Sequence, residues 1–255
     1  MLWHKTWIET RWRFWIGLAV LICSACSTVM IYPQMLKLLG MVPSLNMGGE
    51  IGRRIKESVE LSREYHSYVW SQWFSHNLVQ LWTLFAVLLG TGGLMSQTSG
   101  GGALFTLSMP VSRTRLLAVR AGTGLAELLV LAFVPSILIP LISPSIGESY
   151  GFGNVLVYGA CLFIAGTAFF SLAFLLSTMF TDLWRPLLFA LGIAMVMGLV
   201  DQVVHNPSFY SVFNVMGAEV YFRHGELPWI GLLVSAAASA AMLYAAATNI
   251  ARRDF

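Results

Sequence analysis

The chain has 255 residues, of which 57% are hydrophobic and 11% charged, and its mean hydropathy is +0.72. Because a soluble domain carries about 25% charged and about 45–50% apolar residues, this composition excludes a soluble globular enzyme and a disordered chain. The net charge is only +3 and the Lys and Arg residues are scattered, which excludes a nucleic-acid-binding protein. The composition predicts a polytopic membrane protein.

Six apolar stretches are long enough to cross a bilayer core of roughly 30 Å, which takes about 20 mostly apolar residues in a helix. They are residues 14–32, 78–95, 121–142, 155–180, 187–204 and 229–250. We therefore expect an all-α fold with six transmembrane helices, in a single transmembrane domain over residues 1–255.

The first thirteen residues have an amphipathic pattern. Lys5, Glu9 and Arg13 form one i, i+4, i+8 stripe, and most of the other positions are Trp, Ile or Phe. This pattern favours an interfacial helix over residues 1–13 that lies on the membrane surface before the first span. The alternative is that these residues are the aromatic end of the first span itself.

The basic residues predict the orientation. With both termini in the cytoplasm, the inside segments hold nine Lys and Arg in roughly 50 residues, and the outside segments hold six in roughly 80. The inside segments then include residues 96–120, and the two large outside loops are residues 33–77 and 205–228.

The two outside loops have different characters. In the first, a helix is expected from Glu50 onward, and His66 and His76 lie ten residues apart without a third ligand in pattern, so we expect no metal site. The second is too apolar to lie freely in water. A short re-entrant or interfacial helix pair, buried against protein, is the form that the physics of the bilayer allows.

The segment 96–120 is rich in glycine at its start, but no Gly-Lys-Ser/Thr triplet follows, so it is not a phosphate-binding P-loop. We expect no cofactor in this chain. A short helix is expected to start at Pro110, Val111 and Ser112, because Pro is well tolerated in a first turn and Ser is a good cap. Three basic residues then face the cytoplasm, namely Arg113, Arg115 and Arg120.

A longer motif lies within this segment. It reads Leu107-Ser108-Met109-Pro110-Val111-Ser112-Arg113-Thr114-Arg115-Leu116-Leu117 and follows the second of the six predicted spans. It resembles the L-x-x-P-V-S-R-x-R-L-L stretch of bacterial ABC exporter permeases of the second permease type, which are grouped with the type V exporter fold. Where that family usually has Glu-x-Glu-x-Gly before the motif, this chain has Gln97-Thr98-Ser99-Gly100-Gly101.

The resemblance implies a permease subunit in a bacterial inner (plasma) membrane. In that family two six-span chains pair, as a homodimer or heterodimer, and each docks on a separate ATPase subunit through a coupling helix between spans two and three. ATP and Mg would be bound by that partner, so this chain itself would not be an enzyme. The resemblance places docking on Pro110, Val111, Ser112, Arg113, Arg115 and Arg120, and a transport path lined mainly by spans two and five.

Glu127 is the ionisable residue inside a predicted span that most invites a functional role. It would either hydrogen-bond to Thr or Ser on a neighbouring helix or line the transport path. Because the spans contain few charges, an apolar or amphipathic substrate is expected. An ion- or proton-coupled secondary transporter is the alternative, and a membrane-embedded enzyme lacks the paired His and Asp residues within spans that it would need.

Overall fold

The computed structural model describes residues 2–41, 63–91, 113–180, 182–203 and 211–251. Every regular element in these ranges is a helix. They are α1 (Leu2–Met41), α3 (Tyr65–Val69), η1 (Trp70–Asn77, a π-helix), α4 (Leu78–Gly90), α7 (Arg113–Ile142), η2 (Ser143–Ile146, a 3₁₀ turn), α8 (Phe152–Met179), α9 (Trp184–Val203), α10 (Val212–Met216), α11 (Glu219–His224) and α12 (Trp229–Ala251). Five helices are long and apolar enough to cross a membrane, namely α1, α7, α8, α9 and α12. The chain is thus built as a polytopic α-helical membrane protein.

The predicted second span, residues 78–95, is not among these five. The structure describes it as far as Thr91, with α4 ending at Gly90, and its last four residues lie outside the described ranges. Helical residues nevertheless run without a break from Tyr65 through η1 to the end of α4. The π-helical turns of η1 close i→i+5 hydrogen bonds, so the helix is locally wider there.

The N-terminal residues differ from expectation. Residues 1–13 were expected to form a helix separate from the first span, but α1 runs from Leu2 to Met41 without interruption and passes through Pro33. No Gly or Pro lies between Leu2 and Phe14 to break the helix, and its polar side chains find partners on neighbouring helices, as described below. The aromatic N-terminal residues are therefore the end of the first spanning helix.

A second boundary also differs. The expected coupling segment ended at residue 120, with a span starting at residue 121, but α7 begins at Arg113 and continues to Ile142. Arg113, Arg115 and Arg120 consequently lie in the first turns of a long helix. Apolar Leu116, Leu117 and Val119 sit between them, and both Leu117 and Val119 are buried, so this end of α7 already packs against protein.

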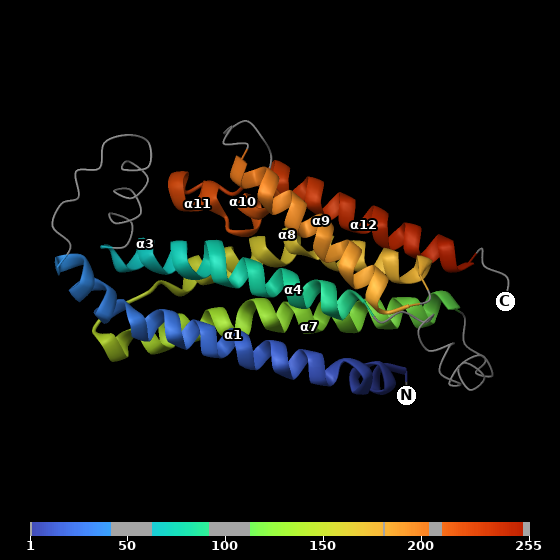
Figure 1. Ribbon diagram of the computed structural model, residues 1–255, viewed down its shortest axis with the longest axis horizontal. Coiled ribbons are helices and arrows are strands. Elements are labelled where there is room, and N and C mark those ends of the chain that lie inside the picture. Colours follow the sequence, from blue (N-terminus) through green and yellow to red (C-terminus); the bar gives the residue numbers. More distant parts are fainter. Residues whose placement is uncertain (1, 42–62, 92–112, 181, 204–210, 252–255) are drawn as a thin grey trace.

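The long helices lie roughly parallel in one elongated bundle (Figure 1). α1 packs mainly on α7, and α8 packs mainly on α12 and α4. The first and last described residues lie at the same end of the bundle, where α4 also ends and α7 begins (Figure 1). The short helices α3, α10 and α11 lie at the opposite end.

Close approach of helices in the core depends on glycine beside large aromatic rings. Trp82 is fully buried and its Nε1 donates a hydrogen bond to Leu128 O at 3.1 Å. A Cβ on Gly166 would lie 2.2 Å from Trp82 Cζ3, and one on Gly90 would lie 2.7 Å from Phe170 O. These glycines set how closely α4 approaches α8, as small residues do in membrane helix packing.

Replacing Gly166 with Ala is expected to lower the stability of the folded chain by roughly 1–3 kcal/mol, because overpacking forces a buried side chain or backbone to move. Trp82 is held by its hydrogen bond to Leu128 O and has no free direction in which to shift. Gly192→Ala is the matched control, since a Cβ there meets nothing within 4 Å. Thermal unfolding midpoints in detergent compare the stability of the two variants. Equal midpoints for Gly166→Ala and Gly192→Ala would contradict this account of the core.

The end of the bundle that carries α3, α10 and α11 is an aromatic cluster. His66 stacks on Tyr150 and on Phe222 with ring centroids 4.9 and 6.1 Å away, and Phe222 stacks on Trp70 at 3.9 Å. Trp70 Nε1 also donates to Gly217 O at 2.9 Å. The expected pair of short helices within residues 205–228 is present as α10 and α11; α10 packs on α8, whereas no residue of α11 is buried.

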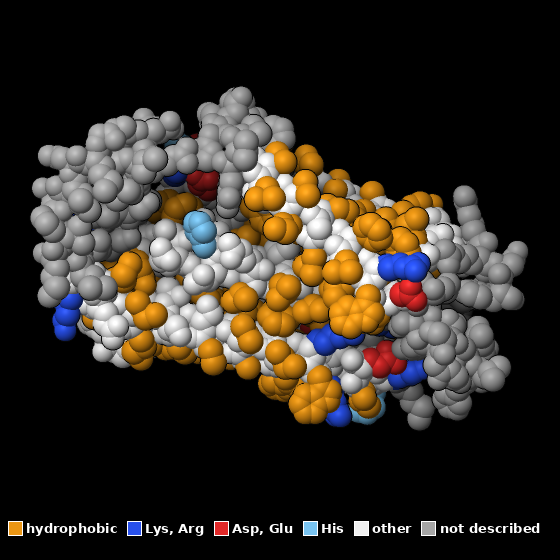
Figure 2. All heavy atoms as spheres, viewed as in Figure 1, with side chains coloured by type: hydrophobic (Ala, Val, Ile, Leu, Met, Phe, Trp, Pro, Cys, Tyr) orange, Lys and Arg blue, Asp and Glu red, His pale blue; other side chains and the backbone are white. Residues whose placement is uncertain are grey.

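The surface has the pattern of a membrane protein. Figure 2 shows hydrophobic side chains spread over the middle of the bundle, whereas the charged side chains visible on this face gather toward its two ends. The most exposed large apolar side chains of α9 and α12 are Trp184, Leu188, Phe189, Met195, Val196, Trp229, Ile230, Leu233, Val234 and Tyr244. Such a surface is stable where lipid or another apolar surface covers it.

Candidate functional site

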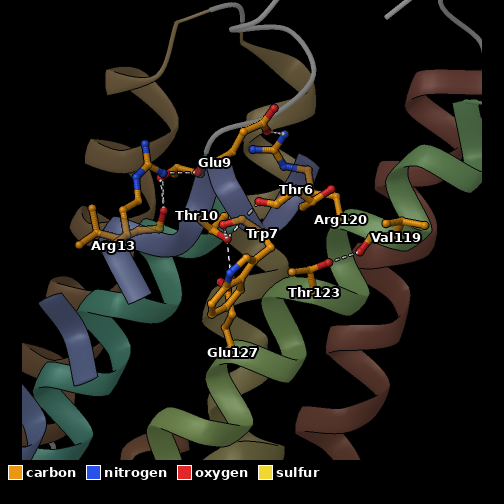
Figure 3. A network of polar contacts seen from close by, with 11 residues as sticks. Thr6, Trp7, Glu9, Thr10, Arg13, Val119, Arg120, Thr123 and Glu127 are labelled. Carbon is orange, nitrogen blue, oxygen red and sulfur yellow. Dashed lines mark hydrogen bonds and ion pairs between the residues drawn. The ribbon is translucent and has the colours of Figure 1, made fainter. Parts of the chain in front are cut away.

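A polar cluster joins α1 to α7 near the end of the bundle where both chain ends lie (Figure 3). Glu9 of α1 forms an ion pair with Arg120 of α7, with Oε2 and Nη1 3.6 Å apart. The Arg120 side chain is only 12% exposed and that of Glu9 is 30% exposed. Because the pair is poorly solvated, removing one partner would leave the other charge uncompensated, which is strongly unfavourable.

Next to Glu9 on α1, the Thr10 hydroxyl Oγ1 shares a hydrogen bond with Oε1 of Glu127 on α7. Glu127 is buried, with 3% of its surface exposed. Of the two alternatives expected for this residue, the structure shows the hydrogen bond to a Thr on a neighbouring helix. A role in a transport path stays a prediction.

Arg13 extends from the same stretch of α1 to a different helix. Its Nη1 donates to Leu88 O and to Thr91 O, each at 2.8 Å. These carbonyls lie at the C-terminal end of α4, where backbone carbonyls lack partners within the helix and the helix dipole is negative. Arg13 therefore caps α4 with a positive charge.

These contacts give residues 9–13 of α1 an unusual position. Through Arg13 they hold the end of α4, and through Glu9 and Thr10 they hold the beginning of α7. α4 and α7 are the helices on either side of residues 92–112 in the sequence. Both ends of that segment are consequently fixed to one helix, and to each other through it.

The residues predicted to dock an ATPase are described only in part. Pro110, Val111 and Ser112 lie outside the described residues, and of Arg113 only the backbone, as the first residue of α7, is described. Arg115 is exposed. Arg120 forms an ion pair with Glu9 of the same chain, although its guanidinium was expected to face the ATPase subunit.

Sequence reasoning missed the partner of Arg120 and the role of Arg13. The stripe of Lys5, Glu9 and Arg13 was the available signal, and its spacing correctly indicated one face of a helix. The stripe predicts a helix on the membrane surface, whereas in the structure Glu9 and Arg13 contact α7 and α4. Helical periodicity shows that residues share a face but not what that face touches.

No other chemistry is assembled in the part of the chain that the structure describes. No group of three His, Cys, Asp or Glu there has the arrangement to hold a metal ion. His66 lies in the aromatic cluster, where burial lowers the pKa of its ring, while His76 Nδ1 contacts Ser71 O at 2.8 Å. The two histidines thus have separate surroundings.

Comparison with protein-family models, with curated proteins and with solved structures finds no match for this chain.

Proposed function

We propose that this chain is the membrane-spanning permease subunit of an ATP-driven exporter, with six spans of which residues 78–95 are the second. The observation that carries the proposal is the motif Leu107–Leu117, with its Pro-Val-Ser-Arg core and following arginine, placed between the second and third predicted spans. A separate subunit would bind ATP and Mg and hydrolyse the ATP, since this sequence has no P-loop.

The polar cluster supports a coupling role for residues 92–112. A segment that receives force from a soluble partner moves spans only if its ends are firmly attached to them. Here Arg13 holds α4, and Glu9 with Thr10 holds α7. A push on the segment would then shift α1, α4 and α7 together, as packed helices shift as rigid bodies.

The exposure of α9 supports a path between two permease chains. Only 22% of its spanning window is buried, against 56% for α8. α9 also contacts α4, so the proposed spans two and five are neighbours. We place the second copy, or a similar chain, over this surface, with an apolar or amphipathic substrate passing between the copies.

The same proposal places the chain in a bacterial inner membrane with both termini in the cytoplasm. The excess of Lys and Arg in residues 1–13, 96–120 and 251–255 supports this orientation. The meeting of both described chain ends at one end of the bundle agrees with an even number of spans (Figure 1).

The direct test is to purify the tagged chain in mild detergent and identify its companions by mass spectrometry. A stoichiometric partner with a Gly-x-x-x-x-Gly-Lys-Ser/Thr motif is the expected result. Transport that continues after ATP depletion and collapses with the proton gradient would instead favour a proton-coupled secondary transporter, for which the buried Glu127 is the supporting observation.

Replacing Arg113 and Arg115 together with Glu is expected to reduce co-purification of the ATPase by at least about tenfold. Reversal of charge at an interface converts attraction into repulsion that costs more than the 1.4 kcal/mol corresponding to tenfold binding. Arg185→Glu is the matched control, because Arg185 is a 65% exposed basic side chain of the same predicted side and lies outside the motif. Quantitative pull-down measures the ATPase recovered with the unmodified chain, the double variant and Arg185→Glu. Undiminished recovery of the ATPase with the double variant would contradict docking at these residues.

A further inference from the structure

The surroundings of Glu127 pose a question about its charge. Oε1 shares a hydrogen bond with Thr10 Oγ1, but Oε2 has no hydrogen-bond partner among the described residues. The residue is 3% exposed and lies within a helix that is long and apolar enough to span the membrane. An ionised carboxylate in this place would have a single hydrogen bond to replace its lost hydration, which is strongly unfavourable.

The basic side chains nearby are already engaged. Arg120 is paired with Glu9, and Arg13 is bound to two carbonyls of α4. Of these, Arg120 also acts on Glu127 through its charge. The charged and titratable residues of this region are His4, Lys5, Glu9, Arg11 and Arg13 on α1 and Arg113, Arg115 and Arg120 on α7. The other helices packed on α7 are α4, α8 and α12, and their described lengths contain no Asp, Glu, Lys, Arg or His.

The contacts of Thr10 also bear on the proton count. Its Oγ1 lies 3.2 Å from Thr6 O as well as next to Glu127 Oε1. A hydroxyl carries one proton, so an ionised Glu127 would compete with Thr6 O for it. If Glu127 is protonated, its own O–H donates to Thr10 Oγ1, and the Thr10 proton remains for Thr6 O.

We propose that Glu127 is a proton-binding site that holds one proton at neutral pH while α1 and α7 are in contact. The ordered chain is Glu127 O–H to Thr10 Oγ1, and Thr10 O–H to Thr6 O. When α1 moves away from α7 and water reaches the carboxyl, the O–H bond breaks, the proton passes to water and the carboxylate remains. Separation of the two helices is thereby linked to release of one proton.

This linkage gives pH a defined direction. Because the joined state binds one proton more than the separated state, raising the pH favours separation, by up to about tenfold in the equilibrium constant per pH unit. The proton site itself does not depend on the proposed transport function. Only its use, as a contact between α1 and α7 that weakens as the pH rises, rests on that proposal.

Infrared spectroscopy of the purified full chain tests the proton directly. The C=O stretch of a protonated carboxylic acid is expected at neutral pH in the unmodified protein and absent in Glu127→Gln. Glu9→Gln is the matched control and is expected to retain the band, because Glu9 is the ionised partner of Arg120. Thr10→Val is expected to shift the band, since it removes the acceptor of the Glu127 proton. A Glu127→Gln spectrum with an unchanged carboxylic acid region would overturn the proposal.

A pH series provides the second measurement. Thermal midpoints of the unmodified chain are expected to fall relative to those of Glu127→Gln as the pH rises from about 4.3, the ordinary pKa of Glu, through neutral pH, because the amide of Gln cannot lose a proton. Titration of Tyr, Cys and Lys is common to both proteins and cancels in the comparison. Parallel midpoint curves would overturn the linkage. Absence of a co-purifying ATPase would contradict the proposed function and leave both measurements unaffected.

Discussion

Replacing Arg120 with Glu is expected to destabilise the folded chain by about 3–5 kcal/mol, the range for breaking a buried ion pair. The new carboxylate would face Glu9 where the guanidinium now lies 3.6 Å from it, so repulsion between like charges would replace attraction. Because total stabilities of folded proteins are about 5–15 kcal/mol, most of the variant should be lost from the membrane fraction. The amount of protein that stays folded in detergent, measured by fluorescence-detected size-exclusion chromatography, gives the size of this loss.

Two further variants separate the ion pair from a general effect of charge. Arg115→Glu changes the same charge at an exposed position on the same helix and is expected to alter stability by no more than about 0.5 kcal/mol. The double variant Glu9→Arg with Arg120→Glu restores opposite charges in reversed order and should recover most of the folded protein. Failure of the double variant to improve on Arg120→Glu alone would refute the pairing.

The sequence predicted the class of fold because that class depends on local properties. Length and hydropathy are sufficient to identify a spanning helix, and five of the six predicted spans correspond to helices that meet these criteria. The apolar character of residues 205–228 likewise predicted short helices buried against protein, and α10 meets this with Val215 and Met216 buried, whereas no residue of α11 is buried. In each case one physical quantity of the segment itself determines the outcome.

The boundaries of the helices could not be predicted in the same way. Residues 1–13 and 113–120 are polar enough to end a membrane helix, and their hydropathy alone favours a change of structure there. α1 and α7 continue through these residues because each supplies the other with polar partners, Glu9 for Arg120 and Thr10 for Glu127. The information lies in the pairing of residues more than 100 positions apart, which periodicity does not contain.

The sequence identified Glu127 as a residue of the candidate site but not the contact of Arg13. Glu127 was singled out because an ionisable residue is costly within a span, and it proved to be buried and hydrogen-bonded to a Thr on a neighbouring helix. Arg13 carried no comparable signal, since an arginine near a predicted cytoplasmic end is explained by the positive-inside rule alone. Its contact with α4 depends on the packing of two helices that no local pattern specifies.

The contacts of Arg13 suggest how motion would be transmitted if residues 92–112 receive a partner. A segment attached at one end only would swivel when pushed. Attachment at both ends to α1 makes the ends of α4 and α7 move together, and α1 extends this movement along the full length of the bundle. Arg13 is then a positioning residue, and its removal should separate partner binding from transport.

Replacing Arg13 with Gln is expected to destabilise the end of α4 by about 1.5–3 kcal/mol, the range for hydrogen bonds that involve a charged group. Thr91 O would lose the Arg13 donor and Leu88 O would keep only the hydroxyl of Thr91, so hydrogen exchange should accelerate at the last backbone amides of α4. Exchange in the middle of α8 should stay unchanged. Arg11→Gln is the matched control, because Arg11 is exposed and lies over the Trp12 ring, 5.8 Å from its centroid.

The same pair of variants tests the transmission of movement. With Arg13→Gln the ATPase should still co-purify, since Arg113 and Arg115 are intact, but ATP-driven transport should fall severalfold because α4 no longer follows α1. Arg11→Gln should leave both unchanged. Equal loss of ATPase binding and transport in Arg13→Gln would show that the residue supports only the fold. Loss of transport alone, together with faster hydrogen exchange at the end of α4, would identify the attachment of α4 to α1 as the part that carries the motion.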